Sequence, residues 1–188
     1  MNILENLKLL LAQCGTSTEQ TIADILFKNS MSISVAESCT GGLVSSRLTD
    51  IAGSSEFIKE NYVTYANEAK MKLLGVSEDT LEHHGAVSAE CAQEMVSGLL
   101  TQSGCDIALI TTGLAGPGGE TEWKKVGLLY VAAKNKYATK IKKIEIKSHH
   151  KRKQMKFLFS QKALEFLIEF LNETELHDNT ADSQIKLN

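Results

Sequence analysis

The chain has 188 residues, 43% of them apolar, and carries a net charge of −3. This size and composition suffice to bury one core, so we expect a single domain over residues 1–172 and a disordered tail over 173–188, where apolar residues become sparse. Charges interrupt the longest apolar runs before they could cross a bilayer, and no apolar signal core opens the chain. We therefore expect a cytoplasmic protein with no membrane partner.

The cysteines and histidines form no recognisable metal or redox motif. The four cysteines, Cys39 among them, contain no C-x-x-C pair, which excludes a zinc knuckle and a dithiol motif, and we expect packed thiols at Cys14, Cys91 and Cys105. Four of the five histidines form two adjacent pairs, and neighbouring side chains on a helix or strand point apart rather than toward one metal. We therefore expect no metal and no cofactor.

Hydrophobic spacing predicts alternating helices and strands along most of the chain. The first half is predicted as a helical region, a strand, a helix, a strand and two short helices, over residues 2–28, 32–36, 41–51, about 57–65, 68–74 and 77–83. The second half is predicted as a helix, three strands and a long helix, over residues 88–103, 106–112, 126–134, 140–147 and 151–171. Ser88 is expected to cap its helix, and Gly75 and Gly104 to end theirs. This order predicts a three-layer α/β/α domain with a mixed, mostly parallel sheet.

Two glycine-containing loops directly follow predicted strands. Residues 37–42, with the sequence ESCTGG, lead from the first strand into a helix, and Gly113–Gly119 follow the apolar strand 106–112. In open α/β sheets ligands collect at the carboxyl ends of strands, and backbone N–H groups at a strand-to-helix junction can hold an anion or a developing oxyanion. We expect the two loops to share one cleft.

Ser55, Lys70 and Tyr65 form one possible hydrolytic group. A serine attacks only when a base removes its proton, and a lysine can act as that base when burial or a neighbouring cation lowers its pKa toward neutrality. Tyr65 could relay the proton or hold the geometry. Spacing alone does not distinguish this group from a helix-capping serine and an exposed lysine.

Ser38 and Cys39 are further candidates in the same segment. Ser38 could attack from a sharp strand-to-helix turn, although the chain lacks the G-x-S-x-G pattern, or it could cap the helix and bind a ligand group. Cys39 could attack instead, as a thiolate stabilised by the helix N-terminus. The residues alone leave these interpretations open.

The segment from Lys134 to Lys156 contains ten Lys or Arg residues and one acid, Glu145, for a net charge of +9. A basic face of this kind indicates attraction of anions, nucleic acid among them. The alternation of lysine and isoleucine over residues 139–147 is also typical of an exposed edge strand whose charges oppose aggregation. Aromatic residues do not interleave with the run as base stacking would require, so we favour the edge strand over nucleic-acid binding.

Three long motifs occur in order along the chain. They are AESCTGGLVSSRLTDIAGSSEFIKENYVTYANEAKMKLLGV, HGAVSAECAQEM and TTGLAGPGGETEWKKVGLLYVA, over residues 36–76, 84–95 and 111–132. These motifs resemble the C-terminal domain of the CinA family, the nicotinamide-nucleotide amidohydrolases, across about residues 5–170. The amino-terminal molybdopterin-binding-like domain of two-domain CinA proteins has no counterpart in this sequence, so we expect the stand-alone form.

The resemblance implies a function. It implies deamidation of nicotinamide mononucleotide to nicotinate mononucleotide and ammonia, a step of pyridine nucleotide salvage. It implies a small-molecule nucleotide substrate, no metal requirement and a homodimer. The alternative function is a non-catalytic binding partner in DNA uptake or repair, which the family's association with competence and the basic segment both suggest.

The resemblance also implies site residues. The family's proposed nucleophile in the G-S-S motif falls on Ser55, its partner lysine in N-E-A-K on Lys70, and the tyrosine of V-T-Y on Tyr65. The implied substrate-binding residues are Ser38, Thr40, Gly41, Gly42, Thr112, Gly113 and Arg152. Among these, Arg152 and the helix N-terminus at Gly41-Gly42 are the candidates for the phosphate of the nucleotide.

Overall fold

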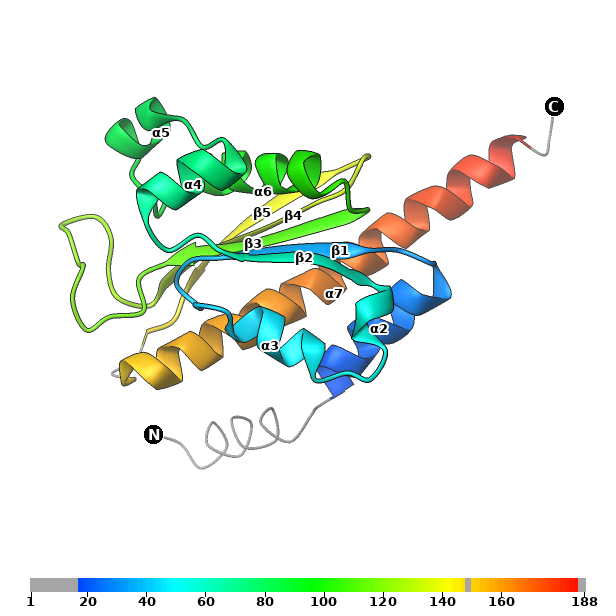
Figure 1. Cartoon of the computed structure of the whole chain (residues 1–188), viewed down its shortest axis with the longest axis horizontal. Coiled ribbons are helices and arrows are strands. Elements are labelled where there is room, and N and C mark those ends of the chain that lie inside the picture. Colours follow the sequence, from blue (N-terminus) through cyan, green and yellow to red (C-terminus); the bar gives the residue numbers. More distant parts are fainter. Residues whose placement is uncertain (1–16, 148–149, 186–188) are drawn as a thin grey trace.

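A five-stranded sheet in the order β2-β1-β3-β4-β5 forms the centre of the molecule (Figure 1). The computed structural model describes residues 17–147 and 150–185, so the part of the expected first helix before Ser17 lies outside the described residues. The elements are α2 (Ser17–Lys28), β1 (Ile33–Glu37), α3 (Leu43–Thr49), the 3-10 helix η1 (Ser54–Glu56), β2 (Ile58–Val63), α4 (Asn67–Leu74), α5 (Glu78–His83), α6 (Ala89–Ser103), β3 (Ile107–Gly113), β4 (Leu128–Lys134), β5 (Thr139–Glu145) and α7 (Arg152–Ile185).

Helices cover both faces of this sheet. Helices α2, α3 and α7 lie on one face, and α4, α5 and α6 lie on the other (Figure 1). Strand β3 is buried along all but its last residue, and its side chains alternate between two cores. Ile107 and Leu109 pack in the core beneath α2, α3 and α7, whereas Ala108 and Ile110 pack in the core beneath α4 and α6. The predicted three-layer α/β/α fold with a mixed sheet is confirmed.

The winding of the sheet reverses at β1. Strands β2 and β3 both run parallel to β1, on opposite sides of it, whereas β4 runs antiparallel to β3 and to β5. The chain reaches β2 through α3 on one face and reaches β3 through α4, α5 and α6 on the other. Open α/β sheets bind ligands at such a switch point, outside the carboxyl ends of the strands. The loops after β1 and β3 leave from this edge.

The basic strand β5 forms one edge of the sheet, as the alternation of its residues predicts. Three of its lysines pair with acids, two of them on α7: Lys140 with Glu173 at 2.6 Å, Lys142 with Glu169 at 2.7 Å and Lys143 with Glu145 at 2.7 Å. These exposed pairs neutralise much of the strand's positive charge, although each contributes little to stability. Four further cations of the basic segment, Lys151, Arg152, Lys153 and Lys156, lie at the start of α7.

The ends of the helices follow the predicted signals in most places. Ser88 accepts a hydrogen bond from Cys91 N, and Gly75 and Gly104 end α4 and α6 in the left-handed conformation. Helix α7 differs, because it continues to Ile185 rather than ending near Leu171 as its apolar pattern predicts. The assignment of residues 173–188 to a disordered tail outside the domain stays a prediction.

Candidate active site

Ser38 and Lys70 meet at the switch point of the sheet. Ser38 directly follows β1, and its N–H donates to Thr111 O at 3.0 Å, which holds the residue beside β3. Lys70 belongs to α4, and its side chain is only 1% exposed. Its Nζ atom lies 3.2 Å from Ser38 Oγ. The structure thus places a buried amine against a serine hydroxyl.

Close packing of α4 on α6 keeps this amine in place. A Cβ atom on Gly98 of α6 would lie 1.7 Å from Leu74 O, at the end of α4. Only glycine permits the two helices to approach this closely. Lys70 is therefore carried on a helix whose position is fixed by backbone contact.

Burial of Lys70 makes its neutral form easier to reach than that of an exposed lysine. Burial lowers the pKa of the Lys70 amine below its usual value. Besides Ser38, the amine contacts two carbonyl oxygens, Thr64 O at 2.8 Å and Tyr65 O at 3.3 Å. A neutral amine has two N–H groups and one lone pair, and a carbonyl can only accept. The charged amine donates to Ser38 Oγ, whereas a neutral amine with both N–H groups on the carbonyls would direct its lone pair at Ser38 Oγ and could accept its proton.

Ser55 lies at the other end of β2 from Lys70. It belongs to the exposed helix η1, directly before β2, whereas Lys70 follows the carboxyl end of the same strand. The six residues of β2 span about 20 Å. In Figure 1 this short helix is the teal turn beside α2, across the molecule from α4. Within one chain, the expected pairing of Ser55 with Lys70 is therefore wrong, and Ser38 occupies the position next to the amine.

Tyr65 contacts the site differently from the expected proton relay. Its side chain is 61% exposed, and its hydroxyl accepts a hydrogen bond from Arg152 Nη2 at 2.7 Å. Only its backbone carbonyl reaches Lys70. The phenol of Tyr65 thus links the end of β2 to α7 and does not face the amine.

The loop after Ser38 presents backbone donors. The N–H groups of Cys39, Thr40 and Gly41 donate to no other strand, helix or loop among the described residues, and that of Cys39 faces its own thiol. Donors directly after an attacking serine are well placed to stabilise an oxyanion. These three N–H groups are the candidates for that role here.

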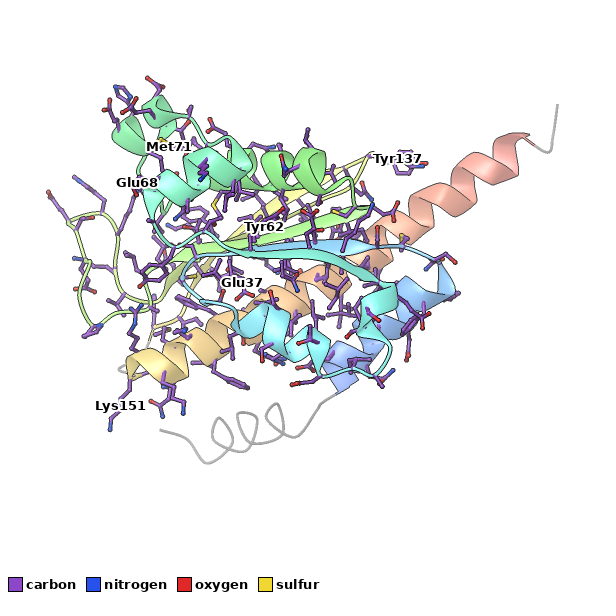
Figure 2. All side chains as sticks on the ribbon, in the orientation of Figure 1. Glu37, Tyr62, Glu68, Met71, Tyr137 and Lys151 are labelled. Atoms are coloured by element: carbon purple, nitrogen blue, oxygen red, sulfur yellow. The ribbon has the colours of Figure 1, made fainter. Side chains whose placement is uncertain are left out.

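The N-terminus of α3 is already occupied by a carboxylate. Glu37 is completely buried, and its side chain lies between the sheet and α3 (Figure 2). Its oxygens accept from Gly42 N at 3.0 Å, Val44 N at 3.0 Å, Ser45 N at 2.8 Å and Ser45 Oγ at 2.6 Å. Glu37 therefore occupies the donors of Gly42, Val44 and Ser45, which makes the helix start a weaker candidate for the phosphate than expected.

Three other expected binding residues have structural partners within the chain. Thr40 Oγ1 is buried 2.7 Å from Thr111 Oγ1 and links the loop after β1 to β3. Thr112 Oγ1 donates to Ala86 O at 2.6 Å and anchors the loop before α6. A Cβ atom on Gly113 would lie 2.5 Å from Leu128 O, so this glycine permits close contact between β3 and β4. These contacts shape the site and occupy the hydroxyls of Thr40 and Thr112, so Thr40 offers a ligand only its backbone N–H.

Arg152 and Lys156 reach the same edge from α7. Arg152 Nη1 donates to Gly116 O at 2.6 Å, in the glycine-rich loop after β3. Lys156 Nζ lies beside the loop after β1, 2.9 Å from where a Cβ atom on Gly41 would be. The sequence analysis identified Arg152 but missed Lys156. Its position four residues later, on the same face of the helix, was the available signal.

Cys39 is poorly suited to attack. Burial, followed by the charge of Glu37, raises the pKa of the Cys39 thiol to about 12. The thiol therefore stays protonated near neutral pH, whereas a cysteine nucleophile needs a thiolate. Cys91 and Cys105 are also free and buried, and Cys14 lies outside the described residues.

Neither a metal-binding cluster nor a membrane-spanning helix occurs among the residues that the structure describes. No group of three His, Cys, Asp or Glu side chains is arranged there to hold a metal ion. None of the described helices combines the length and the apolar character needed to cross a membrane.

The fold and this site define a three-layer α/β domain with a serine-lysine pair at the topological switch point of its sheet. The family described as the CinA C-terminal domain matches residues 15–171. The chain belongs to this family. Residues 15–171 include Ser38, Lys70 and Arg152, so the whole candidate site lies within the matched region.

Relatives and solved structures agree with the family. A CinA-like protein from Chlorobaculum tepidum is 44% identical over 167 residues, covering 87% of this chain and 40% of the relative. The competence/damage inducible protein CihA from Agrobacterium tumefaciens has a TM-score of 0.77 at 38% identity, over 82% of this chain and 93% of that one. A CinA superfamily protein from Klebsiella pneumoniae has a TM-score of 0.78 at 30% identity, over 83% and 96% of the two chains.

The curated relatives are longer than the matched region. The chain spans 40% of the Chlorobaculum protein and 27% of a CinA-like protein from Chloroherpeton thalassium, with which it shares 56% identity over 113 residues. It therefore spans less than half the length of these relatives.

Proposed function

We propose that this protein is an amidohydrolase that deamidates nicotinamide mononucleotide to nicotinate mononucleotide and ammonia. The observation that carries the reaction type is the 3.2 Å approach of Lys70 Nζ to Ser38 Oγ, with two carbonyls accepting from the amine. The substrate rests on the resemblance of the sequence motifs to the nicotinamide-nucleotide amidohydrolases. Fold and family membership alone would not specify a reaction.

In the proposed mechanism neutral Lys70 accepts the hydroxyl proton of Ser38. The Ser38 Oγ atom then forms a bond to the carboxamide carbon, and the electron pair of the C=O π bond moves to oxygen. The N–H groups of Cys39, Thr40 and Gly41 stabilise that oxyanion. As the carbonyl re-forms, the C–N bond breaks and Lys70 returns the proton to nitrogen, which leaves as ammonia.

The second half of the reaction releases the acid. The product of the first half is an ester between Ser38 and the nicotinate group. Water attacks the ester carbon while Lys70 accepts a proton, and the C–Oγ bond breaks. The proton returns to Ser38, which leaves nicotinate mononucleotide and the starting enzyme.

Ammonia release from nicotinamide mononucleotide tests the function. We expect the purified protein to release ammonia and the Lys70→Met variant to lose at least about 10³-fold in kcat, because methionine keeps the length of the side chain but cannot accept a proton. Lys72→Met, a lysine of the same helix but not of the site, is the matched control and should retain activity. Absence of ammonia with the unaltered protein would contradict the function.

Nucleic-acid binding has less support. Lys140, Lys142 and Lys143 are paired with acids, which reduces the positive charge that β5 could offer to a phosphate backbone. A gel shift at low ionic strength tests this alternative, and we expect no shift. Three expectations stay predictions: the homodimer, the cytoplasmic location and the absence of a cofactor. Size-exclusion chromatography tests the homodimer.

A further inference from the structure

Arg152 and Lys156 place two cations on one face of α7. They are four residues apart, so their side chains are neighbours on the helix surface. Arg152 contacts Gly116 O and Tyr65 Oη, and Lys156 Nζ lies beside Gly41. In Figure 2 the labelled Lys151 marks this end of α7, on the same side of the molecule as the loop after β3. Three loops that follow β1, β2 and β3 thus border the same two side chains.

Neither cation is neutralised by an acid. Arg152 and Lys156 form no ion pair in the part of the chain that the structure describes, unlike the lysines of β5. Lys156 also has no hydrogen-bond acceptor there, although its side chain is half-buried. Two like charges four residues apart on a helix repel each other. An anion between them would remove this repulsion.

The pair retains many hydrogen-bond donors. An arginine has five N–H groups and a charged lysine has three. Arg152 uses one from each of its two terminal nitrogens, and Lys156 uses none within the described residues. The three oxygens of a phosphomonoester could accept from the donors that remain, and a dianion matches two cations in charge.

The position of Lys156 relative to Ser38 also fits a nucleotide. Gly41, beside the Lys156 ammonium, is three residues after Ser38 in the same loop. Three residues of chain reach at most about 11 Å. A phosphate at Lys156 would therefore bind within one small molecule's length of the reacting carbon. The neighbouring helix start is a weaker candidate for this anion because Glu37 occupies its donors.

We propose that Lys156, together with Arg152, binds the phosphomonoester dianion of the substrate and makes the site selective for a nucleotide over the corresponding nucleoside. Lys156 is a specificity-determining residue rather than part of the proton transfer. The identity of the nucleotide rests on the proposed function. The affinity for a phosphate dianion does not, because it requires no turnover.

Binding of inorganic phosphate, measured by isothermal titration calorimetry at pH 8, tests the assignment without catalysis. We expect Lys156→Met to weaken phosphate binding by about 10- to 100-fold, the usual loss for a hydrogen bond to a charged group. Lys156→Arg should restore most of the affinity. Lys153→Met is the matched control, since Lys153 is an exposed lysine of the same helix turn and its loss changes the net charge equally.

Each outcome is decisive. Equal phosphate affinity in the unaltered protein and Lys156→Met would overturn the proposal. Equal losses of phosphate affinity in Lys156→Met and Lys153→Met would also overturn it, because they would indicate an effect of long-range charge alone. The same would follow if the unaltered protein bound no phosphate. If phosphate binding behaves as expected but nicotinamide mononucleotide is not deamidated, the phosphate site stands and only the proposed function fails.

Steady-state kinetics give a second readout. Lys156→Met should raise KM for nicotinamide mononucleotide by about 10- to 100-fold with little change in kcat, the pattern of lost uniform binding. The KM for nicotinamide riboside, which lacks the phosphate, should not change. A fall in kcat for both substrates would contradict a binding role.

Discussion

Ser38 and Lys70 are 32 residues apart in the chain, and the Lys70 amine lies 3.2 Å from the Ser38 hydroxyl. The chain between the two residues forms α3, η1, β2 and the start of α4. Strand order brings them together, because β1 and β2 are parallel neighbours and both end at the same edge. The chemistry of the site is thus a consequence of the sheet's winding.

The first prediction concerns the pH dependence of activity. Burial lowers the pKa of Lys70 from its usual 10.5. The amine is protonated and unable to accept a proton below this lowered pKa, and it is neutral and active above it. We therefore expect kcat/KM to rise with pH through a pKa below 10.5 and then to level. The measurement is initial rate of ammonia release against pH.

Lys70→Arg provides the control for this profile. Arginine keeps the positive charge but is not deprotonated in proteins, so the variant should lack activity at every pH tested. A profile of the unaltered protein that is flat, or that falls with rising pH over this range, would contradict a lysine base.

A second prediction concerns the buried carboxylate of Glu37. A glutamine at this position has one acceptor oxygen instead of two. Its NH₂ group would face backbone N–H groups at the start of α3, and an NH₂ group cannot accept a hydrogen bond from them. We expect Glu37→Gln to lower the free energy of unfolding by about 1–3 kcal/mol and to reduce kcat by misplacing the loop that carries Ser38. Urea denaturation and the ammonia assay measure the two effects.

Glu94→Gln is the matched comparison for Glu37. The Glu94 carboxylate also accepts from a helix start, from Ser77 N at 2.7 Å, Ser77 Oγ at 3.2 Å and Thr80 Oγ1 at 2.6 Å, but it is only half-buried. We expect Glu94→Gln to lower the free energy of unfolding by less than about 1 kcal/mol and to leave kcat unchanged. Equal effects of the two substitutions would refute a special role for Glu37.

Much of the fold could be predicted from the sequence, for physical reasons that are local. The continuous apolar run of residues 107–110 predicts a central strand, because a strand covered on both faces buries the side chains on both of its sides. Ser88 and Gly104 mark helix ends because capping chemistry depends on a few adjacent residues. The apolar pattern predicts an end of α7 near Leu171 that is too early, because no capping signal follows Leu171.

The site was harder to predict because it depends on strand order. Ser55 is closer to Lys70 in sequence than Ser38 is, yet β2 separates them in space. In the sequence Glu37 is a charged residue at the end of a predicted strand. Its neighbours in the sequence do not indicate that the start of α3 would enclose its carboxylate. Lys156 lies among other basic residues, so only the packing of α7 distinguishes it from them.

A third prediction concerns the anchoring of α7, which carries Arg152 and Lys156. The buried Arg47 guanidinium donates to Glu19 Oε1 at 2.6 Å, Ser160 Oγ at 3.0 Å and Gln161 Oε1 at 2.6 Å, and so joins α2, α3 and α7. Removing one partner of a buried ion pair is strongly destabilising. We expect Arg47→Met to cost about 3–5 kcal/mol in the free energy of unfolding, measured by urea denaturation.

Lys142→Met tests whether burial is the cause. It also breaks an ion pair to α7, with Glu169 at 2.7 Å, but both side chains are exposed. Its cost should be below about 1 kcal/mol. A loss for Lys142→Met as large as that for Arg47→Met would show that contact with α7, rather than burial, sets the effect.

The assignment of the nucleophile is the central claim. Ammonia release from nicotinamide mononucleotide by Ser38→Ala and Ser55→Ala, assayed side by side with the unaltered protein, tests it most directly. We predict a loss of at least about 10³-fold in kcat for Ser38→Ala and a rate close to that of the unaltered protein for Ser55→Ala. Full activity in Ser38→Ala together with its loss in Ser55→Ala would contradict the assignment.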